Sequence, residues 1–568
     1  MKTSYIPIQK HTNTNYLWAG FILTFLLAGV IGHDPWKQDE TYTFGIIYHF
    51  LNTGYLLIPE NAGVAFMEKP PLYYWTAYFL CRFLGGLLSL PDCARLASPF
   101  YITIAILCVW KTARIIHRDN RDIAWVSLLF FLGTVGIVRH SHDMFTDIAL
   151  LAGCAMAFYG ITLLVYRNTY WKASGLWTGL GIGMAFLSKG MFMPLVLTIS
   201  LAHLLIMLPT MRSRYTAYAL AFGLLVASPF LLIWPALLYH TSPEFFMQWF
   251  WKNNVGRFLG FSVASLGADN KPYYIIASVF WFAFPVFPLA VMAAFRARHD
   301  WKKPEYLLPV TVSSVGLGLL SISASARALY LLPLIPAFTM LASTELFRLP
   351  DKFLHRWNKL MGIAGMLSLI TLWIMWLSLQ PGHPLPQLLP FIGTIFPTDF
   401  TSQHGQWLAI ITAAFAGGFF LYIQLRKDDN RPVAAAQIWF CAIAAVWITV
   451  NTLLLPWLDE TKSYRPVITQ MEDYIRHSPY GGMCMNEYHL GESIAPMLEY
   501  FSDDHILHTV KDFEHATCPL MLTVTGRNDP EELQPGWKLI WKGSRALDVK
   551  DEELRLYVHD EKRQDAPE

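Results

Sequence analysis

Thirteen stretches of this 568-residue chain are apolar over lengths that suffice to cross a lipid bilayer. This repetition constrains the fold strongly, because lipid offers backbone groups no hydrogen-bond partners. Only 15% of the residues are charged, whereas soluble domains carry about a quarter. The sequence predicts a polytopic α-helical membrane protein, with spans at about 16–32, 97–111, 123–138, 147–166, 173–188, 191–208, 215–239, 273–295, 306–325, 328–346, 359–379, 406–425 and 432–456.

Lysine and arginine are distributed unevenly among the loops between these runs. Every second loop is basic, namely 111–122, 209–214, 296–303, 348–359 and 426–431. The loops between these, such as 380–405, are poor in lysine and arginine. Basic loops remain in the cytoplasm. A fourteenth apolar run, 71–90, would invert this pattern if it spanned the membrane. We therefore expect it to lie as a helix in the outer interface, a position that suits its aromatic residues.

The polar tail differs in composition from the rest of the chain. Residues 457–568 carry 34 of the 84 charged side chains, which predicts a membrane domain over 1–456 and a separate C-terminal α/β domain over 457–568. Helix-like segments at 465–477 and 492–502 alternate with strand-like segments at 481–486, 519–525, 537–542 and 554–558. Cys484 and Cys518 could form a disulfide there if the tail is outside the cytoplasm. The net charge is +2 and the sequence has no basic tract, so the composition gives no support to nucleic-acid binding.

Carboxylates cluster in the segments expected outside, which are 33–96, 139–146, 240–272, 326–329, 380–405 and the tail. Asp39 follows the first span beside Glu40, either as a helix cap or as a functional group. Glu68 precedes Lys69 and two prolines, which force an extended turn before the interfacial helix. Asp147 opens an apolar helix at the membrane surface, where an ionisable residue is a functional candidate. The nearby Arg139, His140, His142 and Asp143 match no strong metal-ligand spacing.

Cationic and phenolic groups occupy the outer ends of other predicted helices. Each alone is explained by a side chain reaching toward water. Together they would surround the three carboxylates Asp39, Glu68 and Asp147, as expected of a site where carboxylates act beside a bound phosphate. This set contains Lys69, Lys189, Arg257, Arg327 and Tyr330.

The order of these motifs resembles that of bacterial GT-C glycosyltransferases. The segments "QDETYTFGIIYHFLNTGYLLIP", "MEKPPLYYW", "TDIALL", "FLSKG", "NNVGRF" and "YLLPLIP" follow one another at similar spacing. The closest likeness is to the lipid A aminoarabinose transferase (ArnT-like) family, relatives of the protein O-mannosyltransferases. The resemblance covers residues 16–346 by motif and the remainder by architecture.

This resemblance implies a GT-C fold of about 13 transmembrane helices with periplasmic juxtamembrane helices in 33–96 and a small C-terminal periplasmic α/β domain. It also implies an enzyme of the inner membrane that moves a sugar from polyprenyl (undecaprenyl) phosphate to lipid A or another cell-envelope acceptor. Asp39 would be the general base, with Glu68 and Asp147 in the acidic site. The lipid phosphate would contact Lys69, Arg257 and Tyr330, beside Lys189 and Arg327.

Two departures from the family pattern and two rival functions remain. Tyr42 stands where the family has an arginine, and Asn254 where aminoarabinose transferases tend to carry a histidine. These changes weaken the assignment of aminoarabinose and leave open whether a divalent metal ion is needed. A protein O-mannosyltransferase-like or other surface-glycan transferase is the alternative enzyme. A lipid-linked sugar transporter or flippase is the alternative of another class. Carriers commonly show inverted repeats, whereas the charged groups of this chain are expected to cluster at one face.

Overall fold

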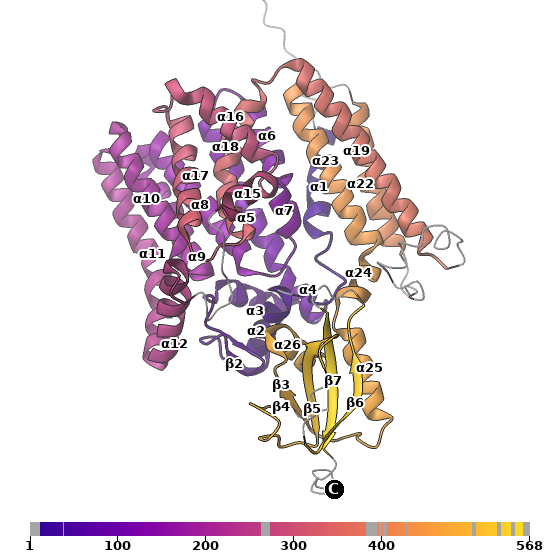
Figure 1. Cartoon of the computed structure of the whole chain (residues 1–568). Helices are drawn as coiled ribbons and strands as arrows, with labels where there is room; N and C mark the ends of the chain where they lie inside the picture. The colour runs from indigo at the N-terminus through magenta and orange to yellow at the C-terminus, as the bar shows by residue number, and fades with distance from the viewer. Residues whose placement is uncertain are drawn as a thin grey trace, which may run out of the picture.

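The computed structural model describes residues 12–37, 39–262, 273–381, 396, 400, 406–426, 430–502, 507–530, 535–546 and 551–559. Its long helices form one block, and a small β-sheet near the C-terminus forms another (Figure 1). The short helices α2 (Asp39–Thr53), α3 (Leu72–Leu84) and α4 (Leu90–Arg95) lie between the two. The loop 380–405, expected outside, falls almost entirely beyond the described residues.

Eight helical segments of the described chain are long and apolar enough to cross a membrane, or nine if one bent pair counts as a span. The eight are Leu90–Ile116, which joins α4 to α5 (Ala97–Ile116), α8 (Thr146–Tyr166), α11 (Arg214–Thr241), α17 (Pro304–Ile322), Ala328–Leu346, which joins η6 (Ala328–Leu334) to α18 (Ile335–Leu346), α19 (Asp351–Ser378), α22 (Trp407–Leu425) and α23 (Arg431–Leu453). A multi-pass helical membrane protein is thus confirmed.

The other predicted spans are helical too, but they do not establish a count of thirteen. They correspond to α1 (Thr12–Leu27), α6 (Arg121–Leu132), α9 (Trp171–Lys189), α10 (Phe192–Met207) and the pair α15 (Tyr274–Phe282) and α16 (Val286–Arg296), which is bent by 105°. The run 123–138 breaks at Gly133, whose carbonyl accepts a hydrogen bond from the Trp439 indole at 2.8 Å. The short helix α7 (Val135–His140) follows this break.

The run 71–90 does not form a spanning helix. Its helix α3 has 13 residues, which corresponds to about 20 Å at 1.5 Å per residue, whereas the hydrocarbon core is about 30 Å thick. Phe79 and Phe83 project from α3 with exposed side chains, while Tyr73 and Tyr74 are fully buried. One face of α3 therefore packs on the protein and leaves an aromatic face uncovered.

Short elements complete the membrane-side architecture. They are β1 (Glu60–Asn61), β2 (Val64–Ala65), η2 (Asn168–Tyr170), η3 (Pro209–Met211), α12 (Pro243–Met247), the π-helical η4 (Gln248–Gly256), α13 (Arg257–Leu259) and η5 (Ala297–His299). Strands β1 and β2 pair antiparallel, with Glu60 opposite Ala65.

The tail folds as a five-stranded sheet with order β4-β3-β5-β7-β6. Strand β3 runs parallel to β4 and β5, and β7 runs antiparallel to β5 and β6. The register places Asn486 opposite Met521, and Thr523 opposite Arg555. The elements are α24 (Leu455–Lys462), α25 (Arg465–Arg476), β3 (Met485–Tyr488), α26 (Gly491–Phe501), β4 (Leu507–Thr509), β5 (Leu520–Gly526), β6 (Trp537–Gly543) and β7 (Glu552–His559).

The predicted elements of the tail correspond closely to this sheet, apart from two strands. The expected strand at 481–486 begins later, at Met485, and β4 was not expected. Cys484 and Cys518 form a disulfide with a Cα–Cα distance of 5.3 Å. The disulfide joins the residue before β3 to the segment that enters β5.

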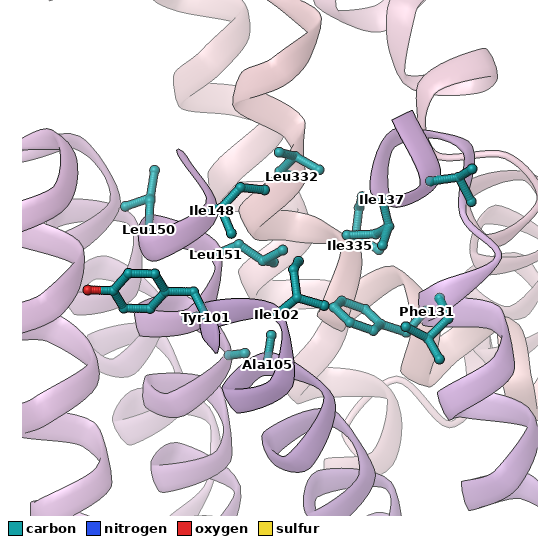
Figure 2. Close-up of a cluster of buried hydrophobic side chains, with 14 of the residues drawn as sticks. Tyr101, Ile102, Ala105, Phe131, Ile137, Ile148, Leu150, Leu151, Leu332 and Ile335 are labelled. Atoms are coloured by element: carbon teal, nitrogen blue, oxygen red, sulfur yellow. The ribbon is translucent and has the colours of Figure 1, made fainter. Parts of the chain in front are cut away.

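The hydrophobic core of the helical block lies where several helices meet. Figure 2 shows Ile102 and Ala105 of α5, Ile148 and Leu151 of α8, and Leu332 of η6 directed toward one another. All five side chains are fully buried. This core holds the start of α8 beside η6, and both segments carry predicted site residues.

Helices α8 and α9 pack with almost no side chain between them. A Cβ atom at Gly181 of α9 would lie 2.3 Å from the backbone nitrogen of Ala157, and one at Gly153 of α8 would lie 2.7 Å from that of Ala185. Any larger residue would force the helices apart. This close contact fixes the start of α8, with Asp147, beside the end of α9, with Lys189.

The tail is tied to the loop that precedes α2. The Asp34 carboxylate accepts hydrogen bonds from the Arg465 guanidinium at 2.6 and 2.8 Å and from the Ser463 hydroxyl at 2.8 Å. The Asp459 carboxylate accepts from the Asp34 backbone N–H at 3.0 Å and from the Trp36 indole at 2.8 Å. The residues immediately before Asp39 are therefore held from the tail side.

Asp459 should make the stability of this junction depend on pH. Burial, together with the nearby Asp34 carboxylate, raises the pKa of Asp459 from 3.8 to about 7. The folded protein therefore holds the Asp459 proton more tightly than the unfolded chain does, and this contribution is lost as the pH rises from about 4 to about 7. The advantage of Asp459→Asn over wild type should be larger at pH 8 than at pH 5, by up to about 3 kcal/mol.

Thermal unfolding of the detergent-solubilised protein at both pH values measures this difference. Asp473→Asn is the matched control, because the Asp473 side chain is 58% exposed. A difference between Asp459→Asn and wild type that does not change with pH would contradict the raised pKa of Asp459.

Candidate active site

Asp39 is the first residue of α2 and lies among the polar side chains that the sequence predicts to come together. Its Oδ1 accepts a hydrogen bond from the Tyr42 hydroxyl at 2.6 Å and a longer one from the Arg327 guanidinium at 3.4 Å. Burial favours the neutral carboxyl, but the charges of Lys69 and Arg327 outweigh it, so the pKa of Asp39 lies below its usual value. Asp39 is therefore ionised at neutral pH, and its side chain remains 28% exposed.

The neighbouring Glu40 has a different role from Asp39. Its side chain is buried, and its Oε1 accepts from the Arg95 guanidinium and from the Met144 backbone N–H, both at 3.0 Å. Its Oε2 accepts from the Trp36 backbone N–H at 3.0 Å. Glu40 thus joins α2 to α4 and to the segment before α8, while Asp39 faces the polar cluster.

Glu68 and Lys69 lie at the turn that the two prolines form before α3. The Lys69 ammonium donates to the Tyr42 hydroxyl and lies 4.6 Å from the centroid of the Tyr42 ring. The Arg257 guanidinium donates to Glu68. Burial alone would raise the pKa of Glu68, but the charges of Lys69 and Arg257 lower it below its usual value. Glu68 and Lys69 therefore contact different partners and do not form an ion pair with each other.

Asp147 and Lys189 form a buried ion pair between the first turn of α8 and the last turn of α9. The Lys189 ammonium lies 2.5 Å from Asp147 Oδ1, and the Asp147 side chain is only 1% exposed. The same ammonium lies 3.7 Å from the centroid of the Tyr330 ring. Tyr330, on η6, is thereby brought next to the two charged residues.

A cavity of about 290 Å³ collects most of these groups. Its polar wall contains six of the eight predicted site residues: Glu68, Lys69, Asp147, Lys189, Arg257 and Tyr330. Its remaining wall is mostly apolar, with Leu150, Met191, Phe192, Met193, Leu195, Val255, Phe258, Leu259 and Leu320. Asp39 and Arg327 do not line the cavity, but Tyr42 connects Asp39 to Lys69 at its edge. The structure therefore brings all eight residues into one continuous cluster.

The group of histidines and aspartates around residue 140 does not converge on Asp147. His140 pairs with Asp143 at 3.0 Å. His142 is buried, bonds to the Phe25 carbonyl at 2.6 Å and stacks on Trp447. Within the described residues, no three His, Cys, Asp or Glu side chains come together to hold a metal ion. The residues at this position do not fit a metal site, and we assign no step to one.

Several residues of the cluster were not identified as functional from the sequence. Tyr42 was noted only as a departure from the family pattern. Asn254 Oδ1 accepts from the Met191 N–H at 3.2 Å, and its Nδ2 donates to the Trp249 carbonyl at 2.9 Å. The Asn253 amide donates to the Met67 carbonyl at 2.9 Å. Their position beside Arg257 in "NNVGRF" was the available signal, and both asparagines line the cavity.

The cavity combines cationic and carboxylate side chains with an apolar wall, within a multi-pass helical membrane protein. A family model described as "Dolichyl-phosphate-mannose-protein mannosyltransferase" matches residues 68–234. The undecaprenyl phosphate-alpha-4-amino-4-deoxy-L-arabinose arabinosyl transferase 1 of Sodalis glossinidius is 25% identical over 94% of this chain and 92% of its own length. The corresponding transferase of Serratia proteamaculans is 23% identical over 74% of each chain.

Solved structures show the same fold. The crystal structure of ArnT from Cupriavidus metallidurans bound to undecaprenyl phosphate matches with a TM-score of 0.66 and 16% identity, covering 96% of this chain and 98% of that one. Its apo state matches with a TM-score of 0.67. The resemblance predicted from the motifs is confirmed: the chain is similar in sequence to these arabinosyl transferases and has the fold of ArnT. The prediction of an enzyme, as opposed to a transporter, is likewise confirmed.

Proposed function

We propose that this enzyme transfers a sugar from undecaprenyl phosphate to lipid A or another acceptor of the cell envelope. The observation that carries the proposal is the cavity, which combines an apolar wall with cationic groups and borders an ionised carboxylate. The curated relatives are named for 4-amino-4-deoxy-L-arabinose and undecaprenyl phosphate, which makes this sugar the first to test.

Lys69 is the residue best placed to bind the donor phosphate. Arg257 and Lys189 already pair with Glu68 and Asp147, whereas Lys69 has no carboxylate at ion-pair distance in the described chain and contacts the Tyr42 hydroxyl. A phosphate would supply the missing anion and form charge-assisted hydrogen bonds. Arg257 Nε is buried and makes no hydrogen bond to described residues, so it offers a second donor. The prenyl chain would lie along the apolar wall.

Asp39 is the proposed general base. Its carboxylate is ionised at neutral pH and partly exposed, so it can accept the proton of an acceptor hydroxyl. The acceptor oxygen would then bond to the anomeric carbon of the sugar. The bond between that carbon and the phosphate oxygen would break, and undecaprenyl phosphate would leave with the electron pair. Lys69 and Arg257 would stabilise the charge of the departing phosphate.

The same site could serve a different acceptor. The family model over residues 68–234 is described for mannose transfer from dolichyl phosphate to protein, which favours a protein O-mannosyltransferase-like enzyme as the second candidate. The two candidates share the polyprenyl-phosphate donor and differ in sugar and acceptor. Mass spectrometry of lipid A, surface glycans and envelope proteins from cells with and without the gene separates them.

We further propose thirteen membrane crossings, with the active site and residues 457–568 in the periplasm. Three observations support this topology. The basic loops alternate with the loops that carry the site, α3 is too short to span, and the tail contains a disulfide of the kind expected in an oxidising compartment.

Replacement of Asp39 should nearly abolish transfer without unfolding the protein. Asp39→Asn keeps the shape of the side chain and an acceptor for Tyr42, but it cannot take a proton at neutral pH. A general base contributes on the order of 10²–10⁴-fold, and we expect a loss in this range when modified lipid A is quantified by mass spectrometry. Asp119→Asn, at an exposed loop position, is the matched control. Asp39→Asn activity within threefold of wild type would remove Asp39 as the base.

Replacement of Lys69 should weaken binding of the lipid phosphate. Hydrogen bonds to charged groups contribute about 1.5–3 kcal/mol, so Lys69→Ala should bind undecaprenyl phosphate roughly ten- to hundredfold more weakly. Lys69→Arg should retain part of the affinity. Binding of purified protein to the lipid alone measures the effect, and Lys172→Ala, an exposed residue of α9, is the control. Equal affinity of Lys69→Ala and wild type would show that Lys69 does not contact the phosphate.

Cysteine labelling should establish the orientation. A single cysteine introduced at Glu514 should react with an impermeant maleimide applied to the periplasm, whereas one at Asp119 should react only after the inner membrane is opened. Both positions are exposed, and the five native free cysteines are buried, so background labelling should be low. Labelling in the opposite order would place the active site in the cytoplasm and overturn the proposed topology.

A further inference from the structure

Tyr42 connects the donor cavity to Asp39 through its hydroxyl group. That hydroxyl donates to Asp39 Oδ1 at 2.6 Å and accepts from the Lys69 ammonium. A tyrosine hydroxyl has one hydrogen and two lone pairs, so both contacts can exist at the same time. Lys69 lines the cavity and Asp39 does not, which makes Tyr42 the link between the cavity wall and the carboxylate.

The position of Tyr42 is fixed by its surroundings. It lies three residues after Asp39 on α2, which places the two side chains on the same helix face. Its ring is 3% exposed and stacks on Phe66 with a centroid distance of 5.0 Å. The ring is therefore locked by packing, and the hydroxyl can transmit that rigidity to the side chains it contacts.

The other contact to Asp39 is weaker. The Arg327 guanidinium lies 3.4 Å from Asp39 Oδ1, and the Arg327 side chain is 51% exposed. An exposed, long side chain at this distance restricts the carboxylate less than a buried hydroxyl at 2.6 Å does. Tyr42 is thus the partner that determines where the Asp39 oxygens point.

Burial alone does not account for the Tyr42 contacts. Tyr74, on the adjacent helix α3, is also fully buried, yet its hydroxyl makes no hydrogen bond to any described residue. The cluster therefore tolerates a buried phenol without a partner, and the two contacts of Tyr42 reflect a specific arrangement of Lys69 and Asp39.

We propose that Tyr42 is a positioning residue that orients the Asp39 carboxylate and links it to the donor phosphate through Lys69. This inference rests on the proposed role of Asp39 as the base. When a phosphate engages Lys69, Tyr42 keeps Asp39 in place although the ammonium turns toward the lipid. The Lys69 ammonium favours the ionised form of Asp39. When a phosphate neutralises that ammonium, the pKa of Asp39 rises, and Asp39 becomes a stronger proton acceptor.

Removal of the Tyr42 hydroxyl should change the chemistry more than the binding. Tyr42→Phe keeps the ring and its packing on Phe66. With undecaprenyl phosphate-4-amino-4-deoxy-L-arabinose as the probe and lipid A as the acceptor, kcat should fall about tenfold while KM for the donor stays within about twofold. A hydrogen bond to the ionised form lowers a carboxyl pKa, so its loss should move the acid limb of the pH profile up by about one unit.

Tyr48→Phe is the matched control, because Tyr48 lies on the same helix but does not line the cavity, and its ring packs against Phe44 and Tyr500. Its kinetics and pH profile should equal those of wild type. An acid limb that Tyr42→Phe leaves unmoved, with kcat within twofold of wild type, would overturn the positioning role. Incorporation of 3-fluorotyrosine at residue 42, which keeps the shape and makes the hydroxyl a stronger donor, should move the acid limb in the opposite direction.

A second measurement does not depend on the identity of the sugar. Carbodiimides react with protonated carboxyls, and peptide mass spectrometry quantifies the modification of Asp39. Tyr42→Phe should be modified several times faster than wild type near pH 5, with Tyr48→Phe unchanged. If wild type shows no transfer with the named donor, the proposed sugar is wrong, but the labelling rates still decide the role of Tyr42. Equal labelling of wild type and Tyr42→Phe would overturn it.

Discussion

The ion pair between Arg95 and Glu40 organises the side of the molecule that carries the candidate site. Arg95 is fully buried, and a buried charge is costly unless it is paired and its hydrogen bonds are satisfied. In the structure, two carboxylates and several backbone carbonyls accept hydrogen bonds from this guanidinium. The partners of Arg95 are Glu40, Asp92 and the carbonyls of Val30, His33 and Asp34, while Glu40 also accepts from Trp36 and Met144. The loop after α1, the helices α2 and α4, and the segment before α8 are therefore joined at one point.

The charge balance of the cavity follows from this fixed frame. Asp39 lies next to Glu40 in sequence, and Asp147 lies three residues after Met144, so both carboxylates are placed by segments that Glu40 holds. Glu68 and Asp147 each have a cationic partner. In the described part of the site, Lys69 is left with a hydroxyl in place of a carboxylate. The site thus carries an excess of positive charge at the cavity wall, where an anionic lipid headgroup would be stabilised.

Much of this arrangement could be predicted from the sequence, because the bilayer limits what a chain can do. Apolar runs must become helices, basic loops set the orientation, and charged residues at helix ends must then meet on one face. These rules suffice to select Asp39, Glu68, Lys69 and Asp147 as candidates, while the roles proposed for them rest on the family resemblance. They also exclude 71–90 as a span, and the 13-residue α3 agrees with that.

The remaining features depend on contacts between distant segments, which no local pattern encodes. Glu40 looks equivalent to Asp39 in the sequence, and only Arg95, 55 residues away, reveals its structural role. The carbonyl of Gly133, where the run 123–138 breaks, accepts its hydrogen bond from Trp439, 306 residues away. Likewise, Tyr42 is distinguished from other tyrosines by Lys69, which reaches it from another loop. A departure from a family motif showed where to look at Tyr42, and the three-dimensional contacts showed what the residue does.

The tail also contacts the helix that carries Asp39. Helix α2 packs against α26, where Phe44 contacts Tyr500 with a ring distance of 4.7 Å, and the Asn61 amide donates to the Glu492 carbonyl at 2.9 Å. The loop before α2 is bound through Asp34 to Arg465. Helix α2 is consequently held by the helical block through Glu40 and by the tail through its far face. The proposed base lies on an element that neither part of the chain fixes alone, so the tail supports the position of Asp39 even though none of its described residues lines the cavity.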